Sequence, residues 1–334
     1  MIVELYKLVS SYDIQSFPVL LRLPLRIIAI LASLPFFAIS LPPIAIDLLT
    51  RCILGGSVSL RPSYTSVFVT WVRACGHLVG GCDDHLAIHM LGTAESIHAV
   101  GVAFLSLAFP SFVVSRDLCG RCNYGDDAIR KATKEGIKQI VILGAGNDTR
   151  LHRLPNLPEA LFEVDAPATQ KSKLNALKSF RNNKVRFVTA NFETESWLQK
   201  LVEAGFDPKQ KSVIIWEGIS YYLTASAIEQ TLESVSKCEK GTKLVFDYAQ
   251  YKTYATVTMA RIGKIAEKVF QAGAKAIGEP WLTVFRDYQL DVMVKDFGLT
   301  FETYPLLART AIKAKLSNRS ENAFDLWLAT VTVN

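Results

Sequence analysis

The sequence predicts an α/β protein in which an apolar helical region precedes a doubly wound, mostly parallel sheet. From residue 116 onward, short apolar segments alternate with helical segments. This alternation is typical of a parallel sheet covered by helices on both faces. The first hundred residues differ, because they contain two long runs without a charged residue. We therefore expect two regions, a hydrophobic helical region at residues 1–115 and a catalytic or binding domain at residues 116–334.

Length and composition exclude several classes of protein. The chain has 334 residues, 50% of them hydrophobic, which is enough for one large domain with an appendage. Its 37 basic and 31 acidic residues give a net charge of +6, without a block of like charges. Proteins that bind nucleic acid usually carry a basic stripe, so we expect no nucleic-acid partner. The six cysteines lack the dense spacing of a secreted disulfide framework and indicate reduced thiols in a cytosolic compartment.

The first apolar run, Ile27–Ile46, contains twenty residues without a charge. A helix needs about 20 such residues to cross a bilayer, so the run predicts a membrane anchor. Pro35, Pro42 and Pro43 would kink or end this helix, although membrane helices tolerate proline better than soluble ones. A signal peptide is one alternative, against which the long polar start at Met1–Phe17 argues. A buried hydrophobic arm broken by prolines is the other.

The second apolar run, Ile97–Ser115, allows two interpretations. It is either the returning half of a membrane hairpin or a core helix of the domain that follows. Basic residues cluster after it, between Arg116 and Lys138, as is typical of the cytoplasmic side of a membrane. We therefore expect a membrane-associated protein whose catalytic domain faces the cytoplasm.

The elements of the predicted sheet follow in order along the chain. We expect strands at residues 139–144, 160–165, 185–190, 212–218 and 242–248, and helices at Ala166–Phe180, Glu193–Ala204 and Thr224–Cys238. Two more strands are expected in "LTFETYPLL" and "FDLWLATVTV" near the end of the chain. The connection between these two is short, which predicts an antiparallel pair at one edge.

A glycine pair, Gly144 and Gly146, follows the first strand. Ligands of open parallel sheets bind at the carboxyl ends of strands, and glycine lets a nucleoside lie close to the backbone. Asp165 ends the second strand, nineteen residues after Gly146, where its carboxylate can accept hydrogen bonds from two ribose hydroxyls. Dinucleotides and S-adenosylmethionine both use this arrangement. A dinucleotide site requires a third glycine where this chain has Thr149, preceded by the acidic Asp148, so the sequence favours S-adenosylmethionine.

Several motifs in order resemble the leucine carboxyl methyltransferase-like family of S-adenosylmethionine-dependent methyltransferases. These motifs are "GIKQIVILGAGNDTRLHRL", "FEVDAPATQKSKL", "WEGISYYLTASAIEQTL", "GEPW" and the closing "LWLAT". The resemblance covers Asp117–Asn334 and does not cover the first hundred residues. It implies a seven-stranded, Rossmann-like class I methyltransferase fold.

The resemblance also implies which residues hold the cofactor: Arg121, Gly144, Gly146, Asp165, Asn191 and Glu217. The arginine would pair with the carboxylate of S-adenosylmethionine, Asp165 with the ribose, and Glu217 with the methionine amino group. Asn191 departs from the family, which usually has an aspartate that meets the adenine edge. An asparagine carbonyl can still accept a hydrogen bond from the adenine amino group.

The expected reaction is transfer of a methyl group to a carboxylate or hydroxyl oxygen on a small molecule or a protein C-terminus. A carboxylate acceptor needs no general base, whereas a hydroxyl acceptor does. The sequence offers no convincing base, and Tyr221 and Tyr222 are weak candidates for contact with the substrate. Two alternatives remain, an NAD(P)-dependent oxidoreductase and a membrane-tethered protein that binds the cofactor without catalysis.

Cys119 and Cys122 form a C-x-x-C motif that has two other interpretations. A redox motif would require a thioredoxin-like unit, which the surrounding pattern lacks. A zinc site would require two more ligands, for example Cys82 and His85. We expect neither, and we expect no metal.

Overall fold

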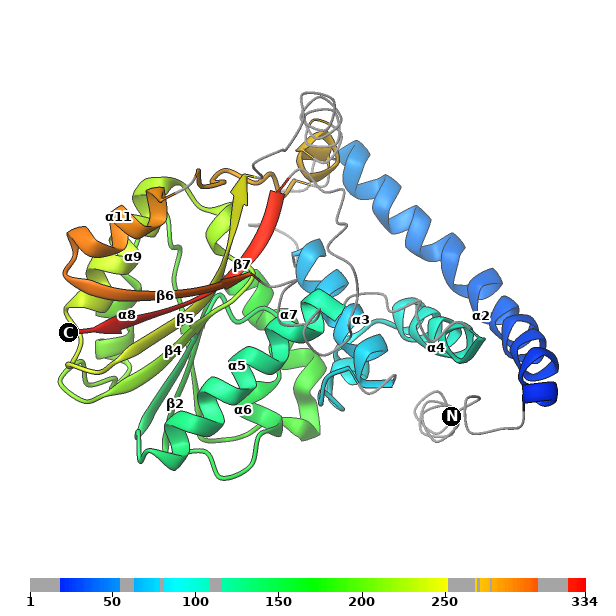
Figure 1. Ribbon diagram of the computed structural model, residues 1–334, viewed down its shortest axis with the longest axis horizontal. Coiled ribbons are helices and arrows are strands. Elements are labelled where there is room, and N and C mark those ends of the chain that lie inside the picture. Colours follow the sequence, from blue (N-terminus) through cyan, green and yellow to red (C-terminus); the bar gives the residue numbers. More distant parts are fainter. Residues whose placement is uncertain are drawn as a thin grey trace.

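The computed structural model describes residues 19–54, 63–78, 81–108, 116–251, 268, 271–276, 278–286, 288–305 and 324–334. Figure 1 shows a twisted sheet with helices on both of its faces. The apolar helices α2 (Val19–Leu54) and α4 (Thr93–Ala108) lie together to one side of the sheet. The α/β architecture and the apolar amino-terminal helix agree with the prediction from the sequence.

The described residues form a seven-stranded sheet with the strand order β3-β2-β1-β4-β5-β7-β6. The strands are β1 (Gln139–Leu143), β2 (Ala160–Asp165), β3 (Val185–Thr189), β4 (Ser212–Trp216), β5 (Lys243–Tyr251), β6 (Leu299–Pro305) and β7 (Phe324–Val333). The first five are parallel to one another, and β7 runs antiparallel between β5 and β6. The mostly parallel sheet and its antiparallel edge are therefore confirmed.

Within the described residues, the labelled helices after the amino-terminal region include α5 (Arg116–Lys134), α6 (Arg150–Arg153), α7 (Pro167–Leu177), α8 (Trp197–Glu203), α9 (Ala225–Ser236) and α11 (Gln289–Asp296). The helix expected at Ala166–Phe180 is α7 followed by a short 3-10 helix, η3 (Lys178–Phe180). The helix expected to start at Glu193 starts only at Trp197. The side chain of Ser196 caps α8 there by accepting a hydrogen bond from the Gln199 backbone nitrogen at 3.2 Å.

Two hydrophobic cores cover the two faces of the sheet, and β1 contributes to both. Val141 and Leu143 belong to the core that packs against α8, α9 and α11. Ile140 and Ile142 belong to the core that packs against α5 and α6. Alternate side chains of a strand point to opposite faces, and both faces of β1 are buried. This double burial explains why the β1 segment is a continuous apolar run in the sequence.

The second apolar run of the sequence becomes α4 as far as Ala108, and residues 109–115 lie outside the described part. This helix contacts α2, where the side chains of Ser40 and His98 form a hydrogen bond of 3.0 Å. Its other contacts are with α3 (Tyr64–Leu78) and the 3-10 helix η2 (Ala87–Met90), against which Val100 is buried. Within the described part of the run, α4 therefore packs against both α2 and α3.

Within the described residues, α2 is the one helix that is long and apolar enough to cross a membrane, over Leu21–Thr50. It continues through all its prolines, which are Pro24, Pro35, Pro42 and Pro43. Ten of its large hydrophobic side chains are exposed: Leu21, Leu23, Ile27, Ile28, Leu31, Leu34, Ile39, Leu41, Ile46 and Leu49. A signal sequence near a chain start passes the same test of length and composition.

Candidate functional site

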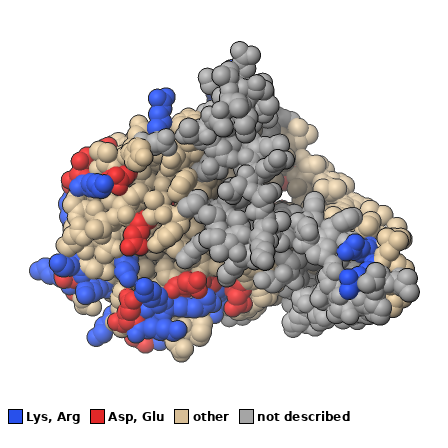
Figure 2. Space-filling model, viewed as in Figure 1, with Lys and Arg blue, Asp and Glu red and all other residues tan. Residues whose placement is uncertain are grey.

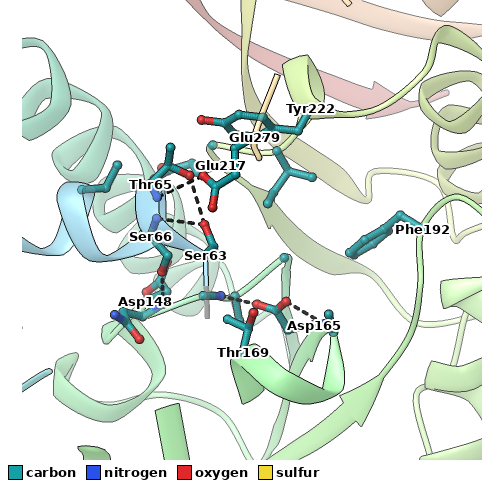
Figure 3. A pocket seen from close by; sticks show the side chains of 18 of the residues that line it. Ser63, Thr65, Ser66, Asp148, Asp165, Thr169, Phe192, Glu217, Tyr222 and Glu279 are labelled. Carbon is teal, nitrogen blue, oxygen red and sulfur yellow. Dashed lines mark hydrogen bonds between the residues drawn. The ribbon is translucent and has the colours of Figure 1, made fainter. Parts of the chain in front are cut away.

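The strand order reverses between β1 and β4, and a cavity of about 690 Å³ opens at the carboxyl ends of these strands. Its wall includes all eight residues that the sequence associates with a cofactor or a substrate: Arg121, Gly144, Gly146, Asp165, Asn191, Glu217, Tyr221 and Tyr222. In Figure 3, Asp165 and Thr169 line one side of this cavity, while Ser63, Thr65 and Ser66 of the α3 region line another. The volume lies within the usual range for small-molecule sites, about 300–1,000 Å³.

The glycine loop after β1 requires its glycines for two reasons. Gly144 and Gly146 have positive φ angles of 62° and 43°, which residues with a side chain rarely adopt. A side chain would also have no room. A Cβ atom on Gly144 would collide with the side chain of Ile219, and one on Gly146 would lie 2.7 Å from Ser66 Oγ. The glycines are predicted to let a ligand lie close to the backbone, and they also let the side chains of Ile219 and Ser66 do so.

Asp165 lies at the end of β2, directly beside the glycine loop. Its carboxylate accepts hydrogen bonds from the backbone nitrogens of Gly146 and Ala166. Burial raises the pKa of Asp165 to about 6, although these two hydrogen bonds act in the opposite direction. A carboxylate has about four lone-pair sites, so two backbone donors leave acceptor capacity for a ligand in the cavity.

Arg121, on α5, is buried against an acidic residue at the centre of the sheet. Its Nη1 donates to Asp247 Oδ2 at 2.7 Å and to the hydroxyl of Tyr221 at 3.1 Å. Asp247 also accepts a hydrogen bond of 2.6 Å from the backbone nitrogen of Gly218. The Nε atom of Arg121 lies 3.9 Å from a carboxylate oxygen of Glu217. This network fixes the guanidinium at the cavity wall.

Glu217 follows β4 and is held by a second buried arginine. Arg150 Nη2 donates to both carboxylate oxygens of Glu217, at 3.0 and 2.9 Å. The same guanidinium pairs with Asp126 at 2.9 Å and with Asp148. Burial raises the pKa of Glu217 despite the opposing charges of Arg150 and Arg121. Burial alone would also raise the pKa of Asp148, but the charges of Arg150 and Arg73 outweigh it and lower that pKa.

Comparison with known proteins shows what the chain is similar to. Residues 80–236 match the model of the leucine carboxyl methyltransferase family. This segment, slightly less than half of the chain, is therefore similar to that family. The resemblance inferred from the sequence motifs is thereby confirmed.

Two bacterial relatives are provisionally named S-adenosyl-L-methionine-dependent methyltransferases. The protein of Mycobacteroides abscessus is 34% identical over 146 residues, covering 42% of this chain and 48% of the relative. The protein of Bacillus subtilis is 32% identical over 186 residues, covering 54% and 59% respectively. The chain thus spans about half the length of the curated relatives it matches. Both names contain the cofactor that the sequence predicts.

A solved structure supports the fold along most of the chain. The crystal structure of a DUF574 family protein from Streptomyces avermitilis superposes with a TM-score of 0.53. The match covers 82% of this chain and 98% of that protein, at 14% sequence identity. At this identity the likeness concerns the fold alone.

Asn191 lies at the cavity wall in an exposed turn. Its side-chain oxygen accepts a hydrogen bond from the backbone nitrogen of Glu193 at 3.0 Å, and its own backbone nitrogen donates to Glu195 at 2.8 Å. An amide oxygen has two lone pairs, so the turn leaves it able to accept one further hydrogen bond. The neighbouring Phe192 also lines the cavity, and Figure 3 shows it on the side opposite α3.

The two tyrosines after Glu217 lie in different surroundings. Tyr221 is buried, and its hydroxyl contacts Arg121 and Asp247. Burial and the neighbouring Asp247 raise its pKa well above the usual value, which makes the phenolate inaccessible near neutral pH. Tyr222 is only partly buried, and burial raises its pKa as well. Both rings pack near Trp281, with centroids 4.3 and 6.5 Å away.

Several residues of this site were not predicted from the sequence. Arg150 stands inside the glycine-loop motif, and its charge four residues after Gly146 was the available signal. Asp247 is an acidic residue in an otherwise apolar strand, a pattern that indicates a buried ion pair. Ser66 and Arg73 carried no signal, because their contacts with the glycine loop join segments far apart in the chain.

The C-x-x-C cysteines lie in a small buried cluster with Cys82. Cys119 and Cys122 both lie on α5, and neither belongs to a disulfide. Within the described ranges, no group of three or more histidine, cysteine or acidic residues is arranged to hold a metal ion. The cluster packs the amino-terminal region against α5.

Proposed function

We propose that this protein is an S-adenosylmethionine-dependent methyltransferase that methylates a carboxylate or hydroxyl oxygen. The observation that carries the proposal is that Asp165, Glu217 and Arg121 line one cavity beside the glycine loop. The family match and the names of the relatives support the same cofactor. The acceptor would be a small molecule or a protein C-terminus.

The donors and acceptors of the cavity fit the groups of S-adenosylmethionine. Asp165 would accept hydrogen bonds from the ribose hydroxyls, and Glu217 would pair with the methionine ammonium. Arg121 would donate to the methionine carboxylate, since a guanidinium has five N–H donors and Asp247 engages only part of them. Asn191 would contact the adenine edge. Gly144 and Gly146 would let the ligand lie against the backbone.

The chemistry requires orientation more than acid–base catalysis. The cofactor supplies a methyl group activated by a sulfonium, and the protein aligns an acceptor oxygen for in-line attack. As the new C–O bond forms, the C–S bond breaks and its electron pair returns to sulfur. A carboxylate acceptor releases no proton, whereas a hydroxyl acceptor must lose one. The raised pKa values of Tyr221 and Tyr222 keep both phenols protonated near neutral pH, so neither is available as a base, which favours the carboxylate.

An NAD(P)-dependent oxidoreductase is the second candidate function. The residues at the position where a dinucleotide site has its third glycine argue against it. Thr149 is fully buried there, and its hydroxyl donates to Asp84 at 2.6 Å. Asp148 adds a negative charge that would repel a pyrophosphate. Calorimetric titration with S-adenosylmethionine and with NAD tests the choice. Binding of NAD alone would overturn the proposal, and binding of S-adenosylmethionine without methyl transfer to any carboxylate or hydroxyl would indicate a binding protein.

We further propose that α2 anchors the protein in a membrane and that residues 116–334, the methyltransferase domain, face the cytoplasm. Support comes from the exposed apolar side chains of α2 and from the basic residues at the start of the domain. The full-length protein should sediment with membranes, resist extraction by salt or alkaline carbonate, and be released by detergent. Recovery in the supernatant without detergent would refute the anchor.

A further inference from the structure

The helix α3 bridges two parts of the chain at the cavity wall. At its amino-terminal end, the carboxylate of Glu279 accepts hydrogen bonds from the backbone nitrogens of Tyr64 and Thr65, at 2.7 and 3.0 Å. A carboxylate at this position also interacts favourably with the helix dipole. Further along α3, Ser66 and Arg73 reach the glycine loop. The helix therefore spans the cavity wall from the segment around Glu279 to the loop after β1, as Figure 3 shows for its first residues.

Two side chains of α3 hold the backbone of Asn147 in the glycine loop, one at its nitrogen and one at its carbonyl oxygen. The backbone nitrogen of Asn147 donates to Ser66 Oγ at 3.0 Å, and its carbonyl oxygen accepts from Arg73 Nη2 at 2.7 Å. The preceding residue, Gly146, donates to the carboxylate of Asp165 from the opposite side. Two successive residues are thus fixed, one by α3 and one by β2.

The charge of Arg73 is already balanced within the protein. Its Nη1 lies 3.0 Å from Asp84, which also accepts from the hydroxyl of Thr149 in the same loop. The side chain of Arg73 is 7% exposed, so this pair is shielded from solvent. The balanced charge makes Arg73 suited to holding the Asn147 carbonyl and unsuited to recognising a charged ligand group.

A loop with two glycines needs such contacts if it is to bind a ligand well. Glycine populates both positive and negative φ angles, so Gly144 and Gly146 leave the unconstrained loop many conformations. Each conformation that does not fit the ligand lowers affinity, because binding must first select the fitting one. Contacts that exist before binding remove this penalty.

We propose that Ser66 and Arg73 are positioning residues of the cofactor site, which hold the Asn147 peptide so that the glycine loop is ordered before S-adenosylmethionine binds. This inference rests on the proposed function. Both residues lie outside the segment 80–236 that matches the family model, and both precede the expected domain at residues 116–334. The cofactor site is therefore built jointly by α3 and the methyltransferase sheet.

The test compares two serine substitutions in the full-length protein, purified in detergent. Ser66→Ala removes the hydrogen bond to Asn147, and calorimetry should show a dissociation constant for S-adenosylmethionine that is about threefold to tenfold higher. Ser196→Ala is the matched control, because it removes one hydrogen bond at the start of α8, away from the cavity. Ser196→Ala should lower the melting temperature to an extent similar to that of Ser66→Ala. It should leave the dissociation constant for S-adenosylmethionine unchanged.

Two further variants separate positioning from general stability. Ser66→Thr keeps the hydroxyl and should restore most of the affinity. Arg73→Lys keeps a positive charge beside Asp84 but loses the planar fork, and should also weaken binding. Equal affinities for the wild type and Ser66→Ala would overturn the inference, as would an equal loss for Ser196→Ala. Failure of the wild type to bind S-adenosylmethionine would instead overturn the proposed function.

Discussion

Acidification should weaken the binding of a nucleoside to this protein through one residue, Asp165. Burial raises the pKa of its carboxyl group to about 6 in the folded protein, above the usual value near 3.8. The ribose hydroxyls donate to the ionised form, so affinity is present above pH 6 and is lost as the pH falls through 6. If only the carboxylate binds, the apparent dissociation constant rises by the factor 1 + 10^(pKa − pH). Between pH 8 and pH 5 this factor is about tenfold, or about 1.4 kcal/mol.

Adenosine is the ligand of choice for this measurement. Adenosine lacks the methionine part of the cofactor and therefore carries no ammonium group for Glu217. The raised pKa of Glu217 should thus not affect the binding of adenosine. Calorimetry or equilibrium dialysis from pH 8 to pH 5 should give the tenfold loss for the wild type. Asp165→Asn should bind weakly at all pH values with a flat profile. A wild-type affinity that changes less than about twofold over this range would refute the ribose assignment of Asp165.

Three further outcomes follow from the same site. Arg121→Lys keeps a positive charge beside the buried Asp247 but loses the planar guanidinium. Affinity for S-adenosylmethionine and S-adenosylhomocysteine should fall about tenfold, while affinity for adenosine stays constant. An equal loss of affinity for adenosine would contradict the pairing of Arg121 with the methionine carboxylate. Glu217→Gln removes the charge and should weaken S-adenosylmethionine in calorimetry without lowering the ligand-free melting temperature, since burial already favours a neutral group there. A protein starting at Ser63 should stay in solution and bind the cofactor, whereas one starting at Arg116 should bind it less tightly, and equal affinities would argue against a contribution of α3.

The sheet and the glycine loop were predictable because their signals are local. Each buried strand is a short apolar run, and the carboxylate of Asp165 directly follows one of them. Turn geometry was less predictable, as the start of α8 shows: Glu193 has good helix propensity, yet Ser196 caps the helix and excludes it. The ambiguity of the Ile97–Ser115 run has a similar origin, because the same apolar composition suits a membrane helix and a packing helix.

The amino-terminal wall of the site could not be predicted from the sequence. Glu279 and Tyr64 are 215 residues apart, and Ser66 and Asn147 are 81 residues apart. No periodicity or short motif encodes such pairs, which form only when the whole chain has folded. Arg150 was partly predictable, because its position in the loop motif is visible in the sequence. Its pairing with Asp126, Asp148 and Glu217 was not.

The contact between Glu279 and α3 sets an order of events during synthesis. A ribosome adds about 5–20 residues per second, so roughly 10 to 40 s separate the synthesis of Tyr64 from that of its partner 215 residues later. During this interval α3 lacks the carboxylate at its first turn, while the apolar α2 has already been made. The proposed anchor, α2, can therefore meet a bilayer before the wall of the cavity is complete. A nascent chain that stops before residue 279 would carry β1 to β5 but neither β6 nor β7, together with an unsecured α3.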